Sequence, residues 1–330
     1  MFRSIIVPLD GSGFAEEALP LATEIASRAR ANVGLLLVHQ PPAVPLVRGS
    51  SAVSDTLDHQ LREAEARYLQ GVEARLRGPG LDSIEGAVLS GPVGESLQAE
   101  IERRGADLVV MSTHGRGGFG RIWLGSVADR LLHALRLPLL LVRPRVDAKS
   151  SAPSVVEQVV VPLDGSPLAE SVLEHAIVLA TLFGAELHLI RVVPPALYLA
   201  PGLDFPITYN PAVDPAVDAA LEQEASDYLG ALAGTLRSRG LRVSTVVERN
   251  AFVADALLTA VQDVPGALLC VSTHGRSGGG RALLGSVADK LVRGASCPVF
   301  VLRPGTTASS ASLADAASAQ QPRQAFAGTG

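Results

Sequence analysis

The residues best suited to chemistry gather in one segment of the chain. It runs from Ser112 through a glycine-rich stretch to Gly125–Val127, and it lies between an apolar run and a segment of helical periodicity. Backbone N–H groups converge in such a loop and at the start of the following helix, where the helix dipole also favours negative charge. Arg116 and Arg121 add positive charge to the loop. The segment therefore suits a phosphate group.

The same segment returns 160 residues later, from Ser272 to Val287, with its histidine and both arginines at the same spacing. A tight turn alone would explain the glycines, but it would not require the histidine and the arginines to recur. The repeat therefore favours anion binding over a purely structural turn. We also expect Ser126 and Ser286 to cap their helices, each with the aspartate three residues further on.

Other phosphate and catalytic motifs fit poorly. No lysine follows a loop glycine as a P-loop requires, and Gly11–Gly13 opens a dinucleotide fingerprint that ends in Glu16 instead of glycine. Asp10, Ser112 and His114 could be interpreted as a catalytic triad, but a loop histidine before a helix more simply contacts phosphate or caps a turn. We predict no catalytic residue and no metal site, and at most slow turnover.

A tandem duplication organises the chain. Ile5–Ser12 returns as Val159–Ser166, 154 residues later, and each copy is long enough to bury a core of its own. The predicted divisions are a first domain over 1–145, a linker over 146–156, a second domain over 157–304 and a disordered tail over 305–330.

Apolar runs alternate with helix-period segments in both copies, which indicates strands and helices of an α/β protein. In the first copy we expect strands at 4–9, 33–39, 84–89, 107–112 and 138–142, and helices at 14–30, 56–77, 94–104 and 126–136. In the second we expect strands at 157–163, 186–192, 242–248, 266–272 and 298–302. Val, Ile and Leu fill these runs, as in strands that helices cover on both faces. The prediction is two tandem doubly wound domains, each a five-stranded parallel sheet with helices on both faces.

Composition and charge exclude several classes of protein. Of 330 residues, 47% are hydrophobic and 18% charged, which is typical of a globular protein. A net charge of −5 gives no overall drive toward nucleic acid or an anionic membrane, so neither is an expected partner. Two cysteines make no disulfide framework, and no apolar stretch approaches the ~18 residues of a membrane span. We expect a cytoplasmic protein.

With its repeated glycine-rich segments, the chain resembles the universal stress protein family, in its tandem form, over residues 1–304. The nucleotide motif of that family reads G-x2-G-x9-G-[ST], and Ser112–Ser126 and Ser272–Ser286 reproduce its spacing with serine at the first position. Each of these serines would either crowd a nucleotide or donate a hydrogen bond to it. The resemblance implies ATP, with or without Mg²⁺, at the carboxyl ends of the first and fourth strands.

The resemblance also implies site residues. Asp10 and Asp164 would hold the adenosine end, and the backbone at Gln40 and Val192 would meet the adenine edge. The full nucleotide-binding set is Asp10, Gln40, Ser112, Gly115, Arg116, Gly125, Ser126 and Val127 in the first copy, and Asp164, Val192, Ser272, Gly275, Arg276, Gly285, Ser286 and Val287 in the second.

The leading hypothesis is an ATP-binding protein of the stress response that acts through nucleotide-dependent association. By resemblance, the halves would form an internal pseudo-dimer through their last strands, Leu139–Val142 and Val299–Leu302, and a further homodimer is left open. One alternative is a slow ATP hydrolase or a phosphorylated switch with Ser126 or Ser286 as acceptor. The other is a scaffold that binds no nucleotide.

Overall fold

A computed structural model describes most of the chain. The described residues are 2–42, 51–78, 80–81, 83–113, 124–144, 155–196, 215–262, 264–273 and 284–303. Four predicted site residues lie outside them: Gly115, Arg116, Gly275 and Arg276. The predicted tail and most of the predicted linker also lie outside, so the domain boundaries remain predictions.

Strands and helices alternate along both halves. The first half contains β1 (Ser4–Leu9), α1 (Gly13–Glu16), α2 (Leu19–Ala29), β2 (Asn32–His39), α3 (Ser51–Leu76), β3 (Ile84–Ser90), α4 (Val93–Arg103), β4 (Leu108–Ser112), α5 (Ser126–Ala134) and β5 (Leu139–Val142). The second half contains β6 (Gln158–Pro162), α6 (Pro167–Glu170), α7 (Leu173–Phe183), β7 (Glu186–Val193), α8 (Pro215–Ser238), β8 (Val243–Arg249), α9 (Val253–Val261), β9 (Ala267–Ser272), α10 (Ser286–Gly294) and β10 (Val299–Leu302).

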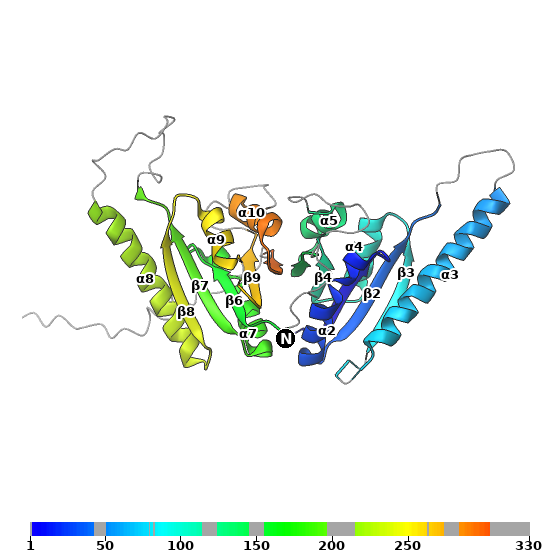
Figure 1. Cartoon of the computed structure of the whole chain (residues 1–330), viewed down its shortest axis with the longest axis horizontal. Coiled ribbons are helices and arrows are strands. Elements are labelled where there is room, and N and C mark those ends of the chain that lie inside the picture. Colours follow the sequence, from blue (N-terminus) through cyan, green and yellow to red (C-terminus); the bar gives the residue numbers. More distant parts are fainter. Residues whose placement is uncertain are drawn as a thin grey trace, which may run out of the picture.

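The ten strands of the described residues join in one sheet, in the order β3-β2-β1-β4-β5-β10-β9-β6-β7-β8. Pairing is parallel within each half, while β5 and β10 are antiparallel, with Leu140 opposite Phe300. The two halves therefore lie on either side of this central pair, and α3 and α8 lie at the outer ends (Figure 1). The α/β class, the doubly wound halves and the pairing of the last strands are confirmed.

Two helix layers cover the sheet, and the core under each layer runs through both halves. On one face, buried residues of α2, α3, α7 and α8 join one apolar cluster that spans the central strands. On the other face, α4, α5, α9 and α10 contribute to a second cluster that also includes both halves. The halves thus share their cores, although each half is long enough to bury a core of its own.

One predicted helix is divided in two. The expected helix at 14–30 is interrupted at Glu17 and Ala18, which separate α1 from α2. Pro20 is in the first turn of α2, where a missing N–H costs nothing because first-turn donors have no partner within the helix. A proline in mid-helix would have removed a hydrogen bond.

The remaining sequence features agree with the architecture. Cys270 and Cys297 are buried, and burial raises the pKa of both thiols, that of Cys297 to about 11, so both thiols stay protonated and unreactive. In the part of the chain that the structure describes, no helix is long and apolar enough to cross a membrane.

Candidate functional site

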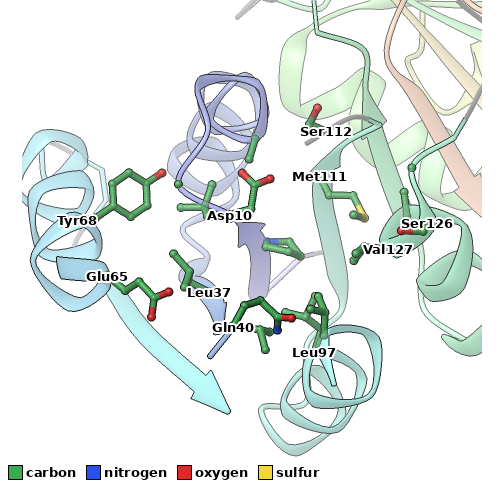
Figure 2. Close-up of a pocket in the computed structure, with 18 of the residues that line it drawn as sticks. Asp10, Leu37, Gln40, Glu65, Tyr68, Leu97, Met111, Ser112, Ser126 and Val127 are labelled. Carbon is green, nitrogen blue, oxygen red and sulfur yellow. The ribbon is translucent and has the colours of Figure 1, made fainter. Parts of the chain in front are cut away.

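A cavity of about 790 Å³ opens in the first half at the carboxyl ends of the strands. The strand order reverses between β1 and β4, and ligands of open α/β sheets bind in the crevice at such a point. Figure 2 shows how the walls converge: Asp10 follows β1, Gln40 follows β2, Ser112 ends β4, and Ser126 begins α5. Each of these four residues belongs to the predicted site.

Asp10 is held by the turn that follows β1. Gly11 has φ 79°, a left-handed conformation that favours glycine, and it turns the chain toward α1. The Asp10 carboxylate accepts hydrogen bonds from the backbone N of Ser12 at 2.9 Å and from its Oγ at 2.6 Å. Ser12 in turn caps α1 by accepting from the N–H of Ala15 at 3.2 Å. The carboxylate is therefore fixed at the edge of the cavity.

The start of α5 differs from the prediction. Gly125 is the N-cap and Ser126 is already the first helical residue, so the expected capping box with Asp129 is wrong, and the same holds for Gly285 and Ser286. The Gly125 N–H donates to the carbonyl of Thr113 at 2.8 Å, which ties the helix start to the end of β4. A glycine N-cap has no side chain to satisfy the first-turn N–H groups. The positive end of α5 thus faces the cavity, where it favours an anion.

Helix α3 forms a wall that the sequence analysis did not predict. Leu61, Ala64, Glu65 and Tyr68 line the cavity from this helix. The Tyr68 hydroxyl donates to Oε1 of Glu16 at 2.8 Å, and burial raises the pKa of Tyr68, so the phenol stays protonated. A signal for this wall was available, because Tyr68 returns as Tyr228 at the 160-residue offset of the glycine-rich segments.

His39 ties this wall to the sheet, although its sequence pattern suggests no role beyond packing in a strand. It is buried at the end of β2, with Nδ1 2.7 Å from Oε2 of Glu65 and Nε2 2.8 Å from Oδ1 of Asp58. Burial lowers the pKa of His39, but the hydrogen bonds to Asp58 and Glu65 outweigh this effect and raise it overall. The imidazolium can donate to both carboxylates and thereby orient Glu65 at the cavity.

The second half has a smaller cavity, of about 220 Å³, at the corresponding place. The predicted residues that line it are Asp164, Val192, Ser272, Gly285, Ser286 and Val287. Asp164 repeats the first turn, since its carboxylate accepts from the backbone N of Ser166 at 2.9 Å. The registers of β1 on β2 and of β6 on β7 make Val192 equivalent to Val38, so Gln40 and Val192 do not occupy equivalent positions.

The first cavity combines three chemical features. Its walls are largely apolar, Asp10 supplies a carboxylate that can accept hydrogen bonds, and α5 supplies N–H donors at its positive end. This arrangement suits a ligand with a ring and hydroxyls at one end and negative charge at the other. Among the described residues, no group of three or more His, Cys, Asp or Glu is placed to hold a metal ion.

Comparison with known proteins identifies the family. The model of the universal stress protein family matches residues 1–143 and again residues 156–303. The chain belongs to this family and contains two of its domains in tandem.

Individual relatives are similar either to nearly the whole chain or to one half of it. A universal stress protein of Mycolicibacterium smegmatis is 28% identical over 304 residues, which cover 91% of this chain and 97% of the relative. One from Thermus aquaticus is 33% identical over 144 residues, which are 43% of this chain and all of the relative. The crystal structure of a universal stress protein from Archaeoglobus fulgidus superimposes with a TM-score of 0.61 at 20% identity, over 92% of this chain and 98% of that one. That likeness confirms the fold.

Proposed function

We propose that this universal stress protein binds ATP in the cavity of its first half. The observation that carries the proposal is the cavity of about 790 Å³ between Asp10 and the start of α5. Asp10 would accept hydrogen bonds from the ribose hydroxyls, and Gln40 would present its backbone to the adenine. The N–H groups of Ser126 and Val127 would meet the phosphates. Any Mg²⁺ would be coordinated mainly by phosphate oxygens and water.

The biological role follows from the family and the proposed ligand. We propose a cytoplasmic stress-response protein whose association with partners depends on bound nucleotide. In this proposal the cavity binds nucleotide without fast turnover. A homodimer of the tandem chain remains a prediction of the sequence analysis.

Binding can be tested on freshly purified full-length protein. Denaturing the protein and identifying the released nucleotide by chromatography should yield an adenine nucleotide. Asp10→Ala should weaken ATP binding about 10- to 100-fold in calorimetry, the equivalent of losing hydrogen bonds to a charged group. Asp10→Asn, which keeps the shape of the side chain, should bind ATP more weakly than the unaltered protein and more tightly than Asp10→Ala.

Asp227→Ala is the matched control, since this exposed aspartate on α8 is remote from the first cavity. It should bind ATP like the unaltered protein. ATP binding fails as a function if no adenine nucleotide co-purifies and none binds at millimolar concentration, which would favour the scaffold. ADP release that disappears in Asp10→Ala would instead favour a slow hydrolase.

A further inference from the structure

The two cavities are built on equivalent elements, but the described side chains around them differ. Strand β1 pairs with β2 in the same register as β6 pairs with β7. Leu37 in the first half therefore corresponds to Arg191 in the second. Leu37 lines the large cavity, whereas the small cavity is lined by the neighbours of Arg191 on either side, Ile190 and Val192.

The facing helices can be matched in the same way. Tyr68 of α3 and Tyr228 of α8 each donate a hydrogen bond of 2.8 Å to the glutamate that ends the short helix after the first strand. With these tyrosines equivalent, Ala64 corresponds to Glu224. A leucine and an alanine that border the first cavity are thus replaced by two long charged residues in the second half.

These two residues contact each other across the space that is open in the first half. Arg191 Nη2 lies 3.3 Å from Oε1 of Glu224, and the guanidinium carbon lies 5.3 Å from the centre of the Tyr228 ring. The Arg191 side chain is only 9% exposed and lies between β7 and α8, whereas the side chain of Glu224 is 64% exposed. Ion pairing and the cation–π contact both favour this position.

The volumes match this arrangement. Four residues of α3 line the large cavity, but no described residue of α8 lines the small one. Cavities that hold small molecules measure about 300–1,000 Å³, a range that includes 790 Å³ but not 220 Å³. We propose that the Arg191–Glu224 pair closes the second cavity, so that the chain binds one nucleotide, in its first half. This inference rests on the proposed ATP binding and adds its stoichiometry and its asymmetry.

Exchanging the two pairs of residues tests the inference. Arg191→Leu with Glu224→Ala should open the second cavity, and Leu37→Arg with Ala64→Glu should close the first. In equilibrium dialysis of full-length protein against radiolabelled ATP, we expect one ATP per chain for the unaltered protein and two for the opened variant. The closed variant should bind at least tenfold more weakly. Asp227→Ala, an exposed position of α8 that lines neither cavity, is the control and should keep one ATP per chain.

Folding is checked by far-UV circular dichroism and thermal unfolding of each variant. Two ATP per chain in the unaltered protein, one of them lost in Asp164→Ala, would overturn the inference and leave ATP binding in place. A folded opened variant that still binds a single ATP would also overturn it. Absence of binding in both the unaltered protein and the opened variant would reject ATP binding itself, and the stoichiometry with it.

Discussion

Two histidines of this chain respond to pH in opposite directions. The pKa of His39 is raised, so its stabilising contribution is complete below the unfolded value of 6.5 and is lost as pH rises through the folded value. The pKa of His175 is lowered, chiefly by burial, so the folded chain loses stability as pH falls below 6.5. Within the described part of the chain, Nδ1 of His175 is buried without a hydrogen-bond partner.

His175 is therefore a site where a substitution should stabilise the protein. Its equivalent in the first half is Leu21, which is fully buried at the same position of α2. His175→Leu should raise the free energy of unfolding by about 1–2 kcal/mol, because a buried unsatisfied polar atom costs about that much. Urea unfolding should show a larger gain at pH 5.5 than at pH 8.

His59→Leu is the control for this experiment, because the His59 side chain is 73% exposed. It should leave stability and its pH dependence nearly unchanged. A loss of stability in His175→Leu at both pH values would show that the contacts of the imidazole with Phe2 and Phe300, at ring distances of 6.4 and 5.6 Å, outweigh the missing hydrogen bond.

At the scale of helices, α5 and α10 are each held at their carboxyl ends by an arginine of the other half. Arg143 donates to the carbonyls of Arg293 at 2.7 Å and Ala295 at 3.1 Å at the end of α10. Arg303 donates to the carbonyl of His133 at 2.5 Å near the end of α5. Cations at this end of a helix satisfy carbonyls without intrahelical partners and oppose the helix dipole.

Removing one of these arginines should loosen the contact between the halves. Arg143→Met should lower the free energy of unfolding by about 1–3 kcal/mol, since charged hydrogen bonds are lost while the apolar stem is largely kept. Arg143→Lys should recover only part of this loss, because an ammonium cannot reproduce the fork of the guanidinium. Arg136→Met, on an exposed arginine, should change stability by under about 0.5 kcal/mol in the same urea titrations.

Sequence patterns predicted elements better than the contacts between distant elements. Continuous Val, Ile and Leu runs identified the strands because buried parallel strands require them. The N-cap of α5 was predicted at Ser126 but is Gly125, one residue earlier. The hydrogen bond from the Gly125 N–H to the Thr113 carbonyl depends on where β4 ends, which the sequence pattern does not show. The Arg191–Glu224 pair joins β7 to α8 across 33 residues, and neither residue belongs to a recognisable motif.

At the scale of the whole molecule, the shared cores should make the two halves unfold together. Phe300 of β10 is fully buried opposite Leu140 of β5, and its ring lies 6.3 Å from that of Phe2. Both apolar clusters cross this central pair. Contact between the halves is thus of the kind found inside one domain, and we expect a single cooperative transition.

The chain offers a probe for this prediction. Trp123, the single tryptophan, is in the first half, whereas Phe300 is in the second. Phe300→Ala should lower the free energy of unfolding by about 3–5 kcal/mol and shift the tryptophan fluorescence and far-UV circular dichroism transitions equally. Phe252→Ala, on a side chain that is 65% exposed, should shift neither by much. Fluorescence that keeps its original midpoint in Phe300→Ala would show that the halves unfold independently.

The antiparallel contact of β5 with β10 joins two domains encoded by one gene. In a symmetric dimer of identical chains, each mutation alters both pockets at once. Here a codon change at Arg191 or Leu37 alters one pocket and leaves its counterpart intact. Duplication thus allows selection to preserve one cavity while the other drifts toward a different use.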